Sequence, residues 1–134
     1  MIDVTCAIIV EGNKILVTQR SETMSLPLKW EFPGGKLEEG ELPEACLLRE
    51  IKEELNIEII LLERLDTIIH DYETYSIRLL PFIARLSTFK ILLTEHKQFK
   101  WLDRTELLGL DWASADEPVL KEFLKLDYDT GRSL

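Results

Sequence analysis

The sequence has little of several features that would assign it to a particular class of protein. Its two cysteines, Cys6 and Cys46, lack the spacing of a metal or redox motif, so we expect small buried thiols in a reducing compartment. No apolar run approaches the roughly 20 residues of a membrane span. Residues 1–10 contain Asp3 and no basic segment, which argues against a signal peptide. These absences predict a cytoplasmic protein without a membrane partner.

Basic charge is also scarce. The chain has 16 lysines and arginines against 25 acidic residues, a net charge of −9. Nucleic-acid polymers are bound by clustered basic side chains, so this balance argues against such a partner. A single nucleotide is not excluded, because a bound metal ion can invert the local charge. Seven of the acidic residues lie between Glu38 and Glu54, so the negative charge is partly local.

The 134 residues contain no internal repeat, low-complexity segment or linker, and they predict a single domain over residues 1–134. Alternating apolar residues and turn signals predict strands at 2–10, 15–19, 30–32, 57–62, 65–70, 75–86 and 99–102. Pro81 within the sixth of these favours an edge position or a bulge. Helices are expected at 43–55, 103–108 and from Asp116, and the polar tail from Asp127 is expected to be frayed. This order indicates an α+β fold with helices packed on a mixed sheet.

The helix at 43–55 has clear limits. Pro43 is favoured at a first helical position, Leu42 would be an N-cap without a hydrogen-bonding side chain, and Asn56 tolerates the left-handed conformation at a helix end. A spacing of about 100° per residue predicts an apolar stripe that faces the core. The predicted stripe consists of Ala45, Leu48, Ile51 and Leu55.

Three acids crowd this helix. Glu50, Glu53 and Glu54 stand at i, i+3 and i+4, where side chains are neighbours. Like charges at this spacing destabilise a helix, and the helix dipole disfavours anions near its C-terminus. A cation is therefore expected, and oxygen ligands favour a hard divalent ion such as Mg²⁺.

With its flanks, this helix resembles a known signature. Gly35, five residues, Glu41, seven residues and then the run from Arg49 to Ile57 match the Nudix box of MutT-like pyrophosphohydrolases, except that Asn56 replaces the final glycine. The likeness extends to Gln19–Arg20, to Trp30–Lys36, to Glu95 before Trp101–Leu102 and to Ala115–Val119. It is greatest to the MutT subgroup and its CTP pyrophosphohydrolase branch. It implies an α/β/α sandwich on a mixed sheet, with the box as a loop–helix–loop.

The resemblance implies a metal site for Mg²⁺ or Mn²⁺. Its ligands would be Glu50, Glu53, Glu54, the Gly34 carbonyl and, from a distant loop, Glu95 as ligand or base. The general base is Glu53, Glu50 or Glu95, and we favour Glu53. Arg49 would pair with Glu41 as a structural element.

Nucleotide binding would involve residues outside the helix. Gly34 and Gly35 permit close approach of the backbone, although ordinary turns use such pairs as often, and Lys36 would lie near the phosphates. Arg20 ends a strand, where it is either a phosphate or base ligand or a surface residue. Phe32 and Tyr75 are candidates for stacking on the base, or for the core.

Asp116 would select the base. Relatives that hydrolyse oxidised guanine nucleotides have asparagine here, whereas an ionised carboxylate only accepts hydrogen bonds and favours the exocyclic amine of cytosine. A protonated Asp116 would donate as well and admit a keto purine. The alternative role is an N-cap of the last helix, and both roles are compatible.

The sequence thus predicts a Mg²⁺-dependent nucleoside triphosphate pyrophosphohydrolase that acts on CTP, dCTP or a modified derivative. The alternatives are an 8-oxo-dGTP-sanitising enzyme, a Nudix hydrolase of dinucleotides, nucleotide sugars or ADP-ribose, and a non-catalytic nucleotide-binding module. The absence of proline from 57–75 disfavours the second alternative, and the complete set of box acids disfavours the third. Both a monomer and a homodimer are compatible with the resemblance.

Overall fold

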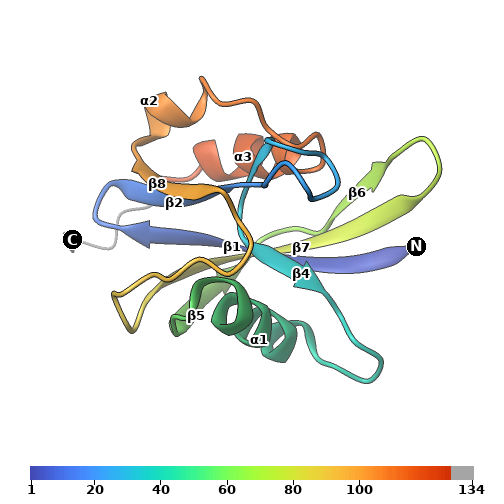
Figure 1. Cartoon of the computed structure of the whole chain (residues 1–134), viewed down its shortest axis with the longest axis horizontal. Coiled ribbons are helices and arrows are strands. Elements are labelled where there is room, and N and C mark those ends of the chain that lie inside the picture. Colours follow the sequence, from blue (N-terminus) through green and yellow to red (C-terminus); the bar gives the residue numbers. More distant parts are fainter. Residues whose placement is uncertain (128–134) are drawn as a thin grey trace.

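The computed structural model describes residues 1–127 and contains one mixed sheet with helices on both faces (Figure 1). The predicted α+β class is confirmed. The frayed tail expected from Asp127 lies, apart from Asp127 itself, outside the described residues. The strands are β1 (Ile2–Glu11), β2 (Lys14–Gln19), β3 (Trp30–Glu31), β4 (Gly34–Lys36), β5 (Ile59–Arg64), β6 (Ile68–Asp71), β7 (Ser76–Leu86) and β8 (Gln98–Leu102), and the helices are α1 (Pro43–Leu55), α2 (Arg104–Leu107) and α3 (Asp116–Leu124).

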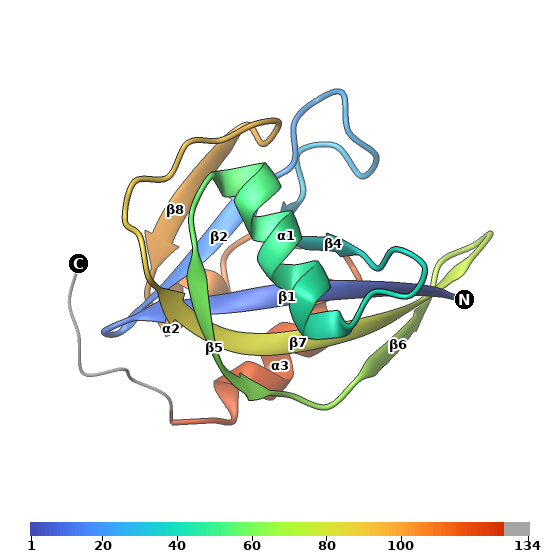
Figure 2. The same cartoon turned by 90° about the horizontal axis from the view of Figure 1, so that it is seen from below.

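Strand β1 is the centre of the sheet. One edge pairs in parallel with β7 from Ile2 to Ile9, whereas the other edge changes partner along its length. Val4–Cys6 pair with β4, and Val10–Glu11 pair with β2, both antiparallel. The sheet therefore divides beside β1, and β4 pairs with β1 and also contacts α1 (Figure 2).

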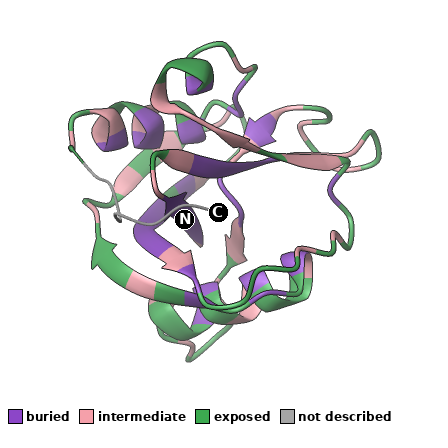
Figure 3. Ribbon diagram, turned by 90° about the vertical axis from the view of Figure 1, so that its left-hand side faces the viewer, coloured by how far each residue is buried: buried purple, intermediate pink, exposed green. Residues whose placement is uncertain are grey.

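The hydrophobic core has two layers, one on each face of the sheet. Alternate residues of β1 point to opposite faces, as the pleat requires: Ala7 and Ile9 pack with α1, and Ile8 and Val10 pack with α3. Along each helix, buried residues alternate with exposed ones (Figure 3). The expected sandwich of helix, sheet and helix is confirmed. Within the described residues, no helix is both long and apolar enough to cross a membrane.

Helix α1 has the predicted limits but not the predicted buried stripe. Ala45 and Leu48 are exposed, whereas Cys46 and Leu47 are fully buried beside the sheet. The buried residues Leu47, Ile51 and Leu55 recur every four positions, and the stripe at 46, 50 and 54 lies next to them. The helix is thus rotated relative to the prediction, and this rotation directs two of its acids inward.

For Pro81 an edge position or a bulge was expected, and the edge position is wrong. Pro81 pairs with Cys6 in the interior strand β7. On its other side it faces the connection between β5 and β6, and its carbonyl accepts the N–H of Leu65 at 2.9 Å. Proline is tolerated in this interior strand because it lies opposite a gap between two partner strands rather than within either pairing.

The C-terminus of α1 depends on one residue in a left-handed conformation. Asn56 has φ 58° and ψ 33°, and its N–H donates to the Lys52 carbonyl. Its side-chain Nδ2 also donates to the Leu92 carbonyl at 2.7 Å, which attaches the loop before β8 to the helix end.

Substitutions of Asn56 should separate the contribution of its left-handed conformation from that of its side-chain hydrogen bond to Leu92. Asn56→Ala and Asn56→Gly both remove the side-chain hydrogen bond, but only alanine carries a Cβ that is strained at positive φ. We expect the alanine variant to be less stable than the glycine variant by about 1–2 kcal/mol in urea denaturation. Equal unfolding midpoints would show that the left-handed conformation does not limit stability.

Candidate active site

The loop before α1 is fastened to the helix by one arginine. Arg49 Nε donates to Glu41 Oε2 at 2.8 Å and its Nη2 donates to Glu41 Oε1 at 2.9 Å, a bidentate pair. This hydrogen bonding lowers the pKa of Glu41 to about 2. Arg49 Nη2 also donates to the Lys36 carbonyl, so one guanidinium holds both ends of the loop.

Strand β4 contains two glycines because there is no room for side chains there. A Cβ on Gly34 would lie 2.0 Å from the carbonyl oxygen of Thr5, and a Cβ on Gly35 would lie 2.2 Å from Cδ of Glu50. Such distances are far below van der Waals contact. The pair therefore allows β4 to approach both β1 and the acidic side of α1.

The three box acids do not share one environment. Glu53 is exposed at the surface, where Arg49 Nη1 lies 3.3 Å from its Oε2. Glu50 is half-buried against Gly35, and Arg49 Nη1 donates to its Oε1 at 2.9 Å. Burial raises the pKa of Glu50 above its ordinary value, Arg49 partly opposes this, and the charges of Glu53 and Glu41 add to the rise.

Glu54 is the most deeply placed of the three. Burial, followed by the negative charges of Glu31 and Glu50, raises the pKa of Glu54 to about 9, although the Gly34 N–H partly opposes this. Its Oε1 atom is buried and has no hydrogen-bond partner among the described residues. A buried carboxylate without a partner is costly unless a proton or a cation neutralises it. The donor set therefore fits a divalent metal ion.

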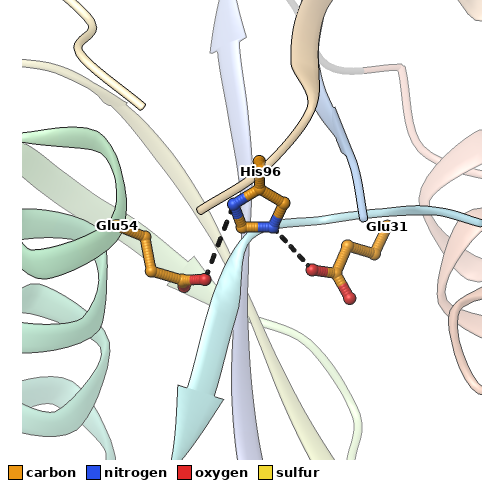
Figure 4. A group of neighbouring side chains, drawn as sticks. All are labelled: Glu31, Glu54 and His96. Carbon is orange, nitrogen blue, oxygen red and sulfur yellow. Dashed lines mark hydrogen bonds and ion pairs between the residues drawn. The ribbon is translucent and has the colours of Figure 1, made fainter. Parts of the chain in front are cut away.

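A second group adjoins Glu54 and was not expected from the sequence. His96 Nε2 lies 2.8 Å from Glu31 Oε2, and His96 Nδ1 lies 3.7 Å from Glu54 Oε2 (Figure 4). Glu31 also accepts a hydrogen bond from Arg20 Nη1 at 2.9 Å. Only the Trp-Glu-Phe-Pro-Gly-Gly run drew attention to Glu31, and no spacing pattern indicated His96.

Arg20, Glu31 and Glu54 line one cavity of about 380 Å³, whereas His96 lies behind the two acids and is not part of its lining. The cavity lies beside the split in the sheet, since its walls come from β1, β4, β7 and the segment before α3. Its charged and polar lining comprises Thr5, Arg20, Ser25, Glu31, Lys36, Glu54 and Asp116, and its apolar lining includes Ile2, Val4, Phe32, Tyr72, Tyr75, Ile77 and Leu79. The combination of an acidic wall with basic and aromatic residues suits a phosphorylated ligand that carries a ring.

Several of the predicted site residues meet around this cavity, whereas Glu50, Glu53 and Glu95 are not part of its lining. Arg20, Phe32, Gly34, Gly35, Lys36 and Asp116 all line it. Glu95 is exposed on the loop before β8 and is not part of the lining, whereas its neighbour His96 is buried against the acids. The role of Glu95 as ligand or base stays a prediction.

Asp116 is not the N-cap of α3, as one interpretation had it. The N-cap is Ala115, and Asp116 is the first helical residue. Its carboxylate turns away from the helix end and accepts the Phe32 N–H at 2.9 Å. Burial, and next the charge of Glu31, raises the pKa of Asp116 well above its ordinary value.

The two aromatic candidates differ in their surroundings. Phe32 is buried, and its ring packs on Trp112 at a centroid distance of 4.8 Å. Tyr75 is 44% exposed and stacks on Tyr72 at 5.0 Å. The hydroxyl of Tyr72 accepts the N–H of Ala115, which ties this aromatic pair to the segment that carries Asp116.

Comparison with known proteins identifies the family. The NUDIX domain model matches residues 1–127. The CTP pyrophosphohydrolase of Escherichia coli is 33% identical over 126 residues, which cover 94% of this chain and 93% of that protein. The 8-oxo-dGTP diphosphatase of Proteus vulgaris is 41% identical over 85 residues, or 63% of this chain and 74% of that protein.

A solved structure agrees with these sequence matches. The solution structure of the MutT protein of methicillin-resistant Staphylococcus aureus, a Nudix hydrolase, has a TM-score of 0.74 at 44% identity and covers 92% of this chain and 95% of that one. This chain belongs to the Nudix family and is a Nudix hydrolase, as its loop–helix–loop resemblance predicted.

The raised pKa of Asp116 predicts that the free energy of unfolding falls as pH rises. The folded state binds the Asp116 proton more tightly than the unfolded chain, whose aspartate pKa is about 3.9. The stability that Asp116 contributes is therefore complete below that value and is lost as pH rises towards the folded pKa. We expect Asp116→Asn to gain stability relative to the parent protein over that range, by at most about 1.4 kcal/mol per pH unit.

Urea denaturation from pH 4 to pH 8 with a chelator present would measure this difference. The neighbouring exposed acid gives the control, since Glu117→Gln removes the same charge without a buried carboxylate. A constant difference between Asp116→Asn and the parent across the pH range would contradict the assignment.

Proposed function

We propose that this protein is a divalent-metal-dependent nucleoside triphosphate pyrophosphohydrolase, which releases pyrophosphate and a nucleoside monophosphate. The observation that carries this proposal is the buried Glu54 carboxylate, whose Oε1 has no hydrogen-bond partner among the described residues and whose pKa is raised to about 9. The chain also retains all the acids of the Nudix box, and it belongs to a family of hydrolases. A site that accumulates negative charge before a triphosphate arrives requires cations.

The metal ligands would be Glu50, Glu53, Glu54 and the Gly34 carbonyl, with Mg²⁺ as the first candidate and Mn²⁺ as the second. When bound, the ion neutralises charge on the phosphate oxygens and lowers the pKa of water beside it. The oxygen donors of this set suit such hard ions.

The chain's own residues would position and activate the reactants. Arg20, held by Glu31, and Lys36 would contact the phosphates from the cavity wall. Glu53 is our choice for the general base, because it is exposed to water, with Glu50 and Glu95 as the alternatives. Arg49 would restrain Glu53 from four residues away and keep the loop in place.

The base of the nucleotide would lie beside Asp116, Phe32 and Tyr75. One oxygen of Asp116 already accepts the Phe32 N–H, so the other is available to a ligand. An ionised Asp116 would favour the amine of cytosine, so CTP, dCTP or a modified derivative is the first candidate substrate. The raised pKa supports the second candidate, an 8-oxo-dGTP-sanitising activity, because a protonated carboxyl also donates to a keto oxygen.

Other features of the protein stay predictions. A cytoplasmic location would place the enzyme with the free nucleotide pool, and the binding partner would be the triphosphate itself rather than a nucleic-acid polymer or a membrane. The monomer and the homodimer both stay open.

A substrate panel tests the proposal. We expect CTP, dCTP or 8-oxo-dGTP, with Mg²⁺ or Mn²⁺, to yield pyrophosphate rather than orthophosphate. Preferential cleavage of ADP-ribose or a dinucleotide would indicate another branch of the family. Absence of turnover by the folded protein with any triphosphate and either ion would favour the non-catalytic module.

Variants assign the base in the same assay. Glu53→Gln should lower kcat by about 10²–10⁴-fold with an unchanged melting temperature. The matched control is Glu44→Gln, an exposed acid at the other end of α1 that should retain the parent rate. If Glu53→Gln is active and Glu95→Gln is not, the base is Glu95.

Asp116→Asn tests the base preference. Asparagine both donates and accepts whatever the pH, so the ratio of kcat/KM for dCTP over 8-oxo-dGTP should fall by about tenfold or more. The exposed neighbour provides the control, because Glu117→Gln should keep the parent ratio. An unchanged ranking in Asp116→Asn would limit Asp116 to its structural contact with Phe32.

A further inference from the structure

His96 occupies an unusual position for a side chain without a motif. It is 6% exposed as a residue, and its side chain is completely buried. The ring lies between two carboxylates that come from different segments, Glu31 in β3 and Glu54 near the end of α1 (Figure 4). Each ring nitrogen faces one of them.

The two ring nitrogens have different partners. Nε2 lies 2.8 Å from Glu31 Oε2, a hydrogen-bond distance. Because an ionised carboxylate only accepts, this contact places the ring proton on Nε2. In the neutral ring Nδ1 then carries a free lone pair. Nδ1 is buried and has no hydrogen-bond partner in the part of the chain that the structure describes.

The Nδ1 lone pair is directed at Glu54. Nδ1 and Glu54 Oε2 are 3.7 Å apart, too far for a hydrogen bond. Two atoms that each lie about 2.1 Å from one metal ion are separated by at most about 4.2 Å, so this distance suits a shared ion. The other oxygen of Glu54 is also buried without a partner among the described residues.

We propose that His96 Nδ1 is a nitrogen ligand of the divalent ion that Glu54 binds. Metal-binding histidines usually donate their other ring N–H to a carboxylate, which fixes the tautomer and orients the ring. Glu31 has this position, and Arg20 in turn holds Glu31 at 2.9 Å. Glu31 is an orienting residue rather than a ligand, because it faces Nε2, on the other side of the ring from Nδ1.

A nitrogen ligand changes which ions the site prefers. Carboxylates and carbonyls suit Mg²⁺, which retains oxygen ligands, whereas first-row transition ions also accept imidazole, Mn²⁺ more weakly than Co²⁺ or Ni²⁺. This inference deepens the proposed function, on which it rests only for the expectation that Glu54 faces a divalent ion. It predicts that the site discriminates between Mn²⁺ and Mg²⁺ more strongly than an all-oxygen site.

The test is electron spin-echo spectroscopy of the protein with one equivalent of Mn²⁺ and no nucleotide. We expect modulation of the echo by a directly bound nitrogen. The frequencies of this modulation should change when histidine is labelled with ¹⁵N. The chain has two histidines, His70 and His96, so a signal that persists in His70→Gln belongs to His96. This control does not depend on whether a variant at the buried position folds.

His96→Gln gives the complementary result. It should abolish the nitrogen signal and lower the preference for Mn²⁺ over Mg²⁺ in calorimetric titrations by about tenfold or more, while His70→Gln keeps both. Mn²⁺ bound without nitrogen modulation, a signal lost in His70→Gln, or no Mn²⁺ binding would each overturn the assignment.

The outcome is separate from that of the proposed function. A protein that hydrolyses triphosphates with Mg²⁺ but shows no nitrogen coupling retains the proposed function and loses His96 as a ligand. A nitrogen-coupled Mn²⁺ in a protein that turns over no triphosphate supports the ligand and rejects the activity.

Discussion

The close approach of β4 to β1 and α1 is the constraint on which the site depends. Gly34 leaves no space for a Cβ beside the Thr5 carbonyl, and Gly35 leaves none beside Glu50. With larger residues at these two positions, β4 could not approach both β1 and the side chain of Glu50 so closely. The split in the sheet beside β1, where the cavity lies, also depends on this strand, since β4 and β2 share one edge of β1.

The acids of the site are not equally paired with positive charge. Arg49 neutralises the outer acids, through a bidentate pair with Glu41 and contacts to Glu50 and Glu53. Its guanidinium does not reach Glu54, where burial and neighbouring acids keep the pKa high. The fold thus stabilises the loop with the Arg49 guanidinium and groups acids inside the cavity that must be neutralised by a proton or by a bound cation.

Local sequence signals predicted the limits of helix α1 correctly, but not which of its faces is buried. Pro43, the uncapped Leu42 and the left-handed Asn56 fixed its limits, because each acts through its own backbone. The buried stripe was wrong at Ala45 and Leu48, since an apolar period does not say how far a helix rotates about its axis when acids must also point inward. The edge position, one of two alternatives for Pro81, was wrong for a similar reason: the local sequence does not reveal a gap between two partner strands. The same holds for Asp116, whose carboxylate bonds Phe32 across the fold instead of capping its own helix.

The sequence by itself determined the family, the fold class and the acids of the box, because these depend on residue type at short, fixed spacing. Only the tertiary structure decided how those acids differ, with Glu53 exposed and Glu54 buried, and which distant side chains join them. Glu31, Glu54 and His96 come from a strand, a helix and a loop, and no spacing along the chain relates them. Their meeting is a consequence of strand pairing and core packing, which act over long separations in sequence and leave no local pattern.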